Sequence, residues 1–199
     1  EFCFEGGIKE YVLYINENQK QKYTLKKESM KTLKIILFFL IITLQISAQY
    51  QIFGNASQLS ANSFQLTPND YNLNGSVWYT LKADLTKDFY ISGQMYFGNT
   101  DGGADGITFV LKDDCLKVGN SGGGIGYKDM PGQTLGIEFD TYQNILGSGV
   151  ELNDDPIYDH IAIQKNGNVS HDDLANVIIA PVPATSSSAN IEDNIWRSY

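Results

Sequence analysis

Short segments in which apolar and polar residues alternate recur from residue 50 onward, separated by clusters of Gly, Asn and Asp. Alternation with a period of two is typical of strands that bury one face, and the intervening residue types are typical of turns. No stretch between residues 50 and 199 combines a helical apolar stripe with capping residues. The pattern therefore predicts an all-β fold, an antiparallel β-sandwich of the jelly-roll kind. The clearest expected strands are 76–81, 89–97, 107–111, 134–142, 160–164 and 177–180, and Asn-Gly within residues 165–168 predicts a tight hairpin.

The first 48 residues follow a different pattern. Residues 30–48 begin with the basic segment MKTLK, continue into a ten-residue apolar stretch and end on Ile-Ser-Ala before Gln49. This order predicts a signal peptide, because ten apolar residues are too few to span a bilayer. We therefore expect a secreted or cell-surface product without a membrane span. Residues 1–29 are polar and lack sustained periodicity, so we expect an upstream leader outside the natural protein and outside the fold.

Composition narrows the possible partners. The net charge is −9, and after residue 48 seven Lys and Arg residues stand against eighteen Asp and Glu residues, a balance of −11. An acidic surface disfavours contact with phosphate backbones, so nucleic acid is not an expected partner. Divalent cations and neutral glycans remain compatible with this charge. The aromatic content of 12% with modest charged content fits a folded β-rich domain rather than a disordered chain.

One segment carries potential metal chemistry. Glu138 and Asp140 lie two residues apart, so an extended strand projects both carboxylates from the same face. Further ligands converge if the following loop folds back: the carbonyl of Tyr142, the amide of Asn144, the carboxylate of Asp155 and the imidazole of His160. Oxygen shells suit Ca²⁺, whereas carboxylates with one imidazole suit Mn²⁺ or another transition ion. Asp140 and Asp155 could bridge both ions. The competing interpretation is a solvated acidic loop.

Five segments, in order, resemble the legume-type (L-type) lectin family over roughly residues 50–199. They are residues 104–111 (ADGITFVL), 121–126 (SGGGIG), 136–142 (GIEFDTY), 159–163 (DHIAI) and 189–196 (ANIEDNIW). The loops are rich in Gly and Asp, and the aromatic residue that plant members place after the paired glycines is Gly124 here. The sequence is thus more similar to the bacterial secreted branch. The resemblance implies a concanavalin-like jelly roll that binds glycans without catalysis.

The resemblance also implies roles for individual residues. The transition-metal ion, Mn²⁺ or a similar ion, would be held by Glu138, Asp140, Asp155 and His160. The Ca²⁺ ion would be held by Asp140, the carbonyl of Tyr142, the side chain of Asn144 and Asp155. The sugar would meet Asp105, a backbone amide near Gly123 and the Asn144 side chain, with the Tyr142 ring as a stacking platform. The family also implies a cis peptide bond between Ala104 and Asp105 in the metal-loaded protein.

By the family's pattern the chain stops in mid-strand at residues 195–199. We therefore expect the lectin domain, residues 49–199, to be C-terminally truncated, with further domains belonging to a longer chain. Missing strands leave open sheet edges, so the fragment alone should aggregate.

Two other functions stay open at this point. A jelly-roll glycoside hydrolase could use the strand that carries Glu138 and Asp140, but a retaining hydrolase needs a second acid on that strand, and Tyr142 stands there instead. A structural adhesion module could keep the metals and lose the sugar. His171 has polar neighbours and no ligand pattern, so we expect it on a surface loop.

Overall fold

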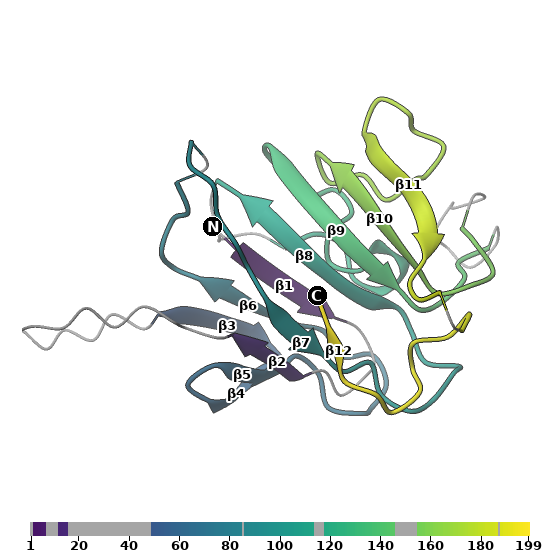
Figure 1. Cartoon of the computed structure of the whole chain (residues 1–199), viewed down its shortest axis with the longest axis horizontal. Coiled ribbons are helices and arrows are strands. Elements are labelled where there is room, and N and C mark those ends of the chain that lie inside the picture. Colours follow the sequence, from purple (N-terminus) through teal and green to yellow (C-terminus); the bar gives the residue numbers. More distant parts are fainter. Residues whose placement is uncertain are drawn as a thin grey trace, which may run out of the picture. The chain divides into compact units, whose positions relative to one another are not determined.

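Figure 1 shows the computed structural model of the chain. It describes residues 2–6, 12–15, 49–84, 86–113, 118–145, 155–186 and 188–199, and of the first two segments only the backbone. The expected signal peptide at residues 30–48 lies outside the described residues. Within the described ranges, no helix has the length and apolar character that crossing a membrane requires.

The described strands form two antiparallel sheets. The seven-stranded sheet has the order β11-β10-β9-β8-β1-β6-β3, and the five-stranded sheet has the order β12-β7-β2-β5-β4. The first contains β1 (Phe2–Gly6), β3 (Tyr50–Gly54), β6 (Gly75–Tyr79), β8 (Gly106–Lys112), β9 (Thr134–Asp140), β10 (His160–Lys165) and β11 (Val177–Pro183). The second contains β2 (Val12–Ile15), β4 (Ser57–Ser60), β5 (Ser63–Gln65), β7 (Gly93–Met95) and β12 (Arg197–Ser198). The remaining element is a short 3₁₀ helix, η1 (Gly122–Gly124).

The main core joins the two sheets face to face. Buried side chains from the seven-stranded sheet pack with buried side chains from the five-stranded sheet in one cluster, which makes the fold a β-sandwich. The cluster includes Tyr50, Val77, Ile107, Phe109 and Phe139 from the first sheet and Phe64 and Met95 from the second. The predicted fold class is confirmed.

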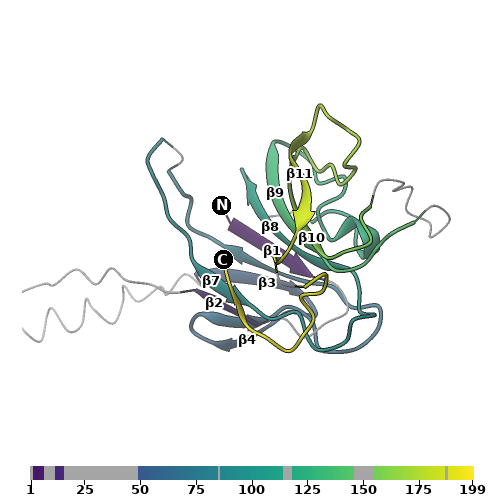
Figure 2. The same ribbon diagram turned by 45° about the vertical axis from the view of Figure 1, so that its right-hand side comes forward.

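Alternation along β8, β9 and β10 separates the core from the candidate site. Figures 1 and 2 show these three strands side by side with β11. On β9, Phe139 enters the core while its neighbours Glu138 and Asp140 project from the outer face. The register places His160 of β10 opposite Asp140. The two carboxylates and the imidazole therefore share one face of the sheet.

A second apolar cluster covers part of that outer face. It consists of Trp78, Val110, Ile125, Tyr127, Met130 and Val169. The Tyr127 ring lies against Gly136 of β9, where a Cβ would approach its ring atoms to 2.7 Å. Its hydroxyl donates to the carbonyl of Gln164 at 3.2 Å. The loop that follows β8 is thereby fixed over the sheet beside the carboxylates.

Most predicted strands are confirmed, with two differences. The expected strand 89–97 is a strand only over β7, and the expected tight hairpin after β10 is wrong. Asn166 and Gly167 adopt positive φ values of 60° and 68°, as the Asn-Gly pattern requires, but the next strand starts only at Val177. The Asn-Gly turn is set by local sequence. The longer loop that connects it to β11 depends instead on the packing of Val169 in the outer cluster.

The expectation that residues 1–29 lie outside the fold is wrong for two segments. β1 pairs along its whole length with β6 on one side and with β8 on the other, and β2 pairs with β5 and β7. A strand between β6 and β8 satisfies backbone N–H and C=O groups that burial would otherwise leave unpaired. Strands of four or five residues need no sustained periodicity, which is why the sequence pattern missed them.

A chain that starts at residue 49 should aggregate. Its loss of β1 and β2 opens the seven-stranded sheet between β6 and β8 and the five-stranded sheet between β5 and β7. Size-exclusion chromatography and thermal melting of residues 49–199 beside the full chain measure this effect. A monodisperse 49–199 fragment with one cooperative melting transition would contradict the expectation.

Candidate functional site

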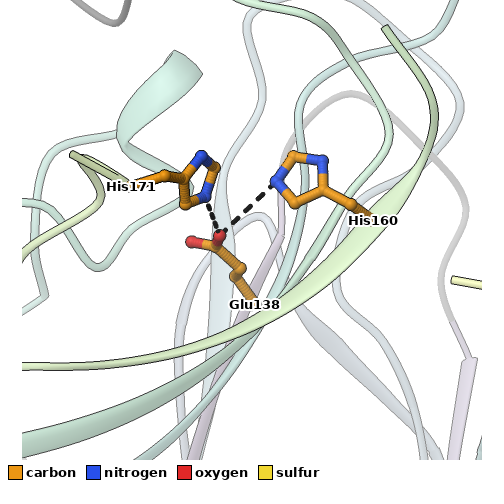
Figure 3. A group of neighbouring side chains, drawn as sticks. All are labelled: Glu138, His160 and His171. Carbon is orange, nitrogen blue, oxygen red and sulfur yellow. Dashed lines mark hydrogen bonds and ion pairs between the residues drawn. The ribbon is translucent and has the colours of Figure 1, made fainter. Parts of the chain in front are cut away.

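Two overlapping groups of side chains on the outer face are suited to metal binding. One contains Glu138, His160 and His171, and the other contains Asp140, Asp155 and His160; within each group the potential ligand atoms lie within 4.8 Å of one another. His160 Nε2 lies 3.5 Å from Glu138 Oε1 and 3.6 Å from Asp155 Oδ1. Figure 3 shows both imidazoles turned toward the Glu138 carboxylate. Because a single nitrogen binds one ion, both groups describe one centre around His160.

The loop after β9 is hydrogen-bonded to two carboxylates of this centre. The Tyr142 amide donates to Asp140 Oδ1 at 2.8 Å, and the Asn144 amide donates to Asp155 Oδ2 at 2.6 Å. The Gln143 side chain donates to the carbonyl of Asp155 at 3.0 Å. Asp155 thus lies against the start of the loop, although residues 146–154 between them are outside the described residues.

The electrostatics of the centre favour a bound cation. Burial raises the pKa of Asp140 well above its usual range, and the charge of Asp155 raises it further. Burial also raises the pKa of Asp155. Burial by itself would raise the pKa of Glu138, but its contacts with His160 and His171 outweigh this and lower the pKa. Negative charge held in a buried site without a compensating cation is unfavourable, and a divalent ion removes that cost.

Two buried polar atoms provide a test of the fit to metal. Asn144 Oδ1 and His160 Nε2 are both buried and have no hydrogen-bond partner within the described part of the chain. Buried polar atoms are normally paired, so each points to a missing partner. The amide oxygen of Asn144, whose backbone amide contacts Asp155, suits Ca²⁺, and an imidazole nitrogen beside carboxylates suits a transition ion. The residues present therefore fit the two kinds of ion.

A further group of residues, Asp105, Gly123 and Asn144, lies next to the metal ligands, and we refer to it as the cradle. Asp105 directly precedes β8, whose first residue, Gly106, pairs with Asp140, and the Asp105 carbonyl accepts from the Thr141 amide at 3.0 Å. A Cβ added at Gly123 of η1 would clash with the Asn144 side-chain amide. The Asp105 carboxylate is close to the same short helix, since its Oδ2 would lie 4.0 Å from a Cβ on Gly122. A carboxylate, a glycine backbone and an amide thus lie together. The Ala104–Asp105 peptide bond is cis.

A comparison of the whole sequence with protein families gives a match that covers most of the chain. The family model described as the legume lectin beta-barrel domain matches residues 42–198, most of the chain. The chain belongs to the legume lectin family. Legume lectin domains are carbohydrate-binding and, as a family, non-catalytic, and they generally bind metal ions. The predicted family and fold are both confirmed.

In this legume lectin domain the predicted site residues converge. All of the predicted side-chain metal ligands are buried: Glu138, Asp140, Asn144, Asp155 and His160. Asp105 and Gly123 are buried beside them, and Tyr142 is 44% exposed at the rim, where an aromatic ring is accessible to a ligand. The roles assigned to these residues stay predictions.

The expectation for His171 is wrong. Its side chain is only 7% exposed, and its Nε2 lies 2.5 Å from Glu138 Oε1. The sequence pattern missed it because the path of the loop after β10 depends on packing of Val169 rather than on local alternation. One feature of the sequence could have indicated a role for His171: the chain contains only two histidines, and the other one, His160, is a predicted metal ligand.

The hydrolase alternative is not favoured in this legume lectin domain. Glu138 is buried beneath the two imidazoles, and its other oxygen, Oε2, accepts from Gln164 Nε2 at 3.0 Å. A glycosidase nucleophile must reach the anomeric carbon of a bound sugar, and a second carboxyl group must stand about 5 Å away across the bond. A carboxylate that is enclosed by its own hydrogen-bond partners does not meet the first condition.

Proposed function

We propose that this legume lectin domain binds glycans in a metal-dependent manner, with one Ca²⁺ and one transition-metal ion, Mn²⁺ or a related ion, at the outer face of β9 and β10. The observation that carries the proposal is the buried Asn144 Oδ1, which has no hydrogen-bond partner among the described residues and lies against Gly123, in a residue whose backbone amide donates to Asp155 Oδ2. Calcium would hold that oxygen, which leaves the amide nitrogen of Asn144 to donate to a sugar hydroxyl.

The sugar contacts follow from the chemistry of vicinal hydroxyls, which both donate and accept. The Asp105 carboxylate would accept charge-assisted hydrogen bonds from the sugar hydroxyls. The Gly123 amide and the Asn144 side chain would donate hydrogen bonds to them. Glycine at position 123 lets the backbone approach the ligand closely. The exposed ring of Tyr142 would pack on the apolar face of the sugar.

Calcium would act on the sugar indirectly. Asp140 would hold the ion. Because Gly106 pairs with Asp140 in the sheet, the position of Asp140 would fix that of Asp105, the residue before Gly106. Monovalent affinity in such a shallow polar site should lie between ~1 mM and ~10 μM, with avidity gained from repetition of the site.

A glycan array probed with the full chain tests the proposal. Binding should occur with Ca²⁺ and Mn²⁺ present, disappear after chelation with EDTA and return when both ions are restored. Metal-independent binding, or no binding to any glycan by a folded and metal-loaded chain, would contradict it. Slow hydrolysis of an array sugar in the presence of EDTA would instead favour the glycosidase alternative.

We also propose that the protein is exported, in keeping with the signal-peptide pattern of residues 30–48, and that it belongs to the bacterial secreted branch of the family as part of a longer chain. Cleavage after Ala48 would remove β1 and β2, so another strand would have to pair with β6 and β8. N-terminal sequencing of the protein recovered from its native source tests the cleavage, and an N-terminus upstream of residue 49 would contradict it.

A further inference from the structure

A second imidazole lies at the transition-metal side of the site. His171 follows β10 in the chain, its side chain is 7% exposed, and its Nε2 makes a 2.5 Å hydrogen bond with Glu138 Oε1. The rings of His160 and His171 stand nearly perpendicular, at 81°, with their centroids 4.9 Å apart. Both rings direct a nitrogen toward the same carboxylate oxygen, as Figure 3 shows. This convergence draws on residues from β9, from β10 and from the loop beyond β10.

The loop that carries His171 is held by its own contacts. Asn168 donates to Gln164 Oε1 and, at 2.7 Å, to the carbonyl of Ser170, while the Ser170 amide donates to Asn168 Oδ1 at 3.2 Å. Gln164 in turn donates to Glu138 Oε2. Oε2 of Glu138 is thus fixed by an amide, and Oε1 is presented to both imidazoles.

The distances suit an ion between these atoms. Ligand bonds of first-row ions to imidazole are about 2.0–2.1 Å, so neighbouring ligand atoms in a coordination shell lie about 3–4 Å apart. His160 Nε2 and Glu138 Oε1 are separated by 3.5 Å, and His160 Nε2 and Asp155 Oδ1 by 3.6 Å. His160 is 1% exposed, and its Nε2 has no hydrogen-bond partner among the described residues. The 2.5 Å contact of His171 with Glu138 is a hydrogen bond that an entering ion would replace.

We propose that His171 Nε2 is a direct ligand of the transition-metal ion, which makes the centre a two-histidine carboxylate site. The proposal rests on the metal-dependent function above and deepens it by naming the kind of ion. Imidazole nitrogens suit Zn²⁺, Co²⁺ and Ni²⁺ better than they suit the oxygen-preferring Mn²⁺. Replacement of one oxygen or water ligand by a second imidazole therefore shifts the preference of the centre from Mn²⁺ toward these ions.

An untagged full chain with Ca²⁺ and stoichiometric Zn²⁺ provides the direct measurement. The chain has two histidines in all, so each imidazole can be followed separately by ¹⁵N nuclear magnetic resonance. Zinc should move the Nε2 resonance of both rings to the range of coordinated nitrogen. Zinc that moves only the His160 resonance would overturn the proposal, and this result needs no variant.

Substitution measures the effect on ion preference. His171→Asn keeps a polar group of smaller size, and it should lower Zn²⁺ affinity about tenfold or more while it changes Mn²⁺ affinity less. Leu174→Ala, at an 84% exposed position of the same loop, is the matched control and should leave both affinities unchanged. An unchanged ratio of Zn²⁺ to Mn²⁺ affinity in folded His171→Asn would overturn the proposal.

Different results would contradict the lectin function and the assignment of His171 as a metal ligand. Coordination by both imidazoles without any glycan binding would overturn the lectin function and leave the ligand assignment intact. Metal-dependent glycan binding with only His160 coordinated would overturn the assignment of His171, which would then be a hydrogen-bond partner that positions Glu138, and leave the lectin function intact.

Discussion

Substitution of Asp140 by Asn should abolish tight binding of both metal ions and, with them, glycan binding. The Asp140 carboxylate lies in the group with Asp155 and His160, and its backbone pairs with Gly106 beside Asp105. Loss of a residue that only hydrogen-bonds to a metal ligand typically lowers metal affinity about 10- to 100-fold. Loss of Asp140, a ligand proposed to bind both ions, should therefore lower the affinity about 100-fold or more. Isothermal titration of Ca²⁺ and of the transition ion into the variant measures this directly.

In the metal-free protein, Asp140→Asn should not lower the thermal stability, although it weakens metal binding. Burial and the neighbouring Asp155 raise the pKa of Asp140, so its carboxylate is unfavourable in the fold without a cation. The neutral amide that Asp140→Asn introduces relieves that repulsion, and the variant without metal should melt at or above the temperature of the metal-free parent. Asp113→Asn, at an exposed carboxylate, serves as the control. Retention of both ions by Asp140→Asn would contradict the assignment.

Substitution of Asp105 by Asn should remove glycan binding while both metal ions remain bound. Asp105 contributes a buried carboxylate to the cradle but belongs to neither group of metal ligands. A hydrogen bond to a charged group is worth about 1.5–3 kcal/mol, which corresponds to a loss of about 10- to 100-fold in glycan affinity. The combination separates the sugar contacts from the metal contacts.

Parallel titrations with metal and with the best glycan from the array measure that separation. Asp101→Asn, an exposed change in the loop that precedes the cis bond, is the matched control and should bind both ligands normally. Unchanged glycan affinity in Asp105→Asn would show that the sugar site has been assigned to the wrong residues.

The sequence predicted those parts of the site that follow from local geometry. The period of two along β9 places Glu138 and Asp140 on one face, and the strand assignment of β10 adds His160. The cis bond at Asp105 does not follow from alternation, and only the family resemblance indicated it. The approach of Asp155 was predicted only on the condition that the loop after β9 folds back, a condition that alternation does not supply. Both depend on how loops fold back onto the sheet.

Two features were beyond the sequence pattern because they depend on distant contacts. His171 reaches Glu138 through a loop whose course is set by Val169 in the outer cluster. β1 and β2 gain their structure from pairing with β6, β8, β5 and β7, far along the chain. Short strands carry little local signal, so the identity of their partners decides whether they form.

We expect bound cations to shape the pocket for sugar hydroxyls, so metal content and glycan binding should be measured on the same sample. The folded full chain, equilibrated with excess Ca²⁺ and transition metal and then dialysed, should retain one calcium ion and one transition-metal ion per chain by elemental analysis. EDTA should remove both ions together with glycan binding. A folded chain that retains neither ion, or that binds glycan equally well without them, would contradict this expectation.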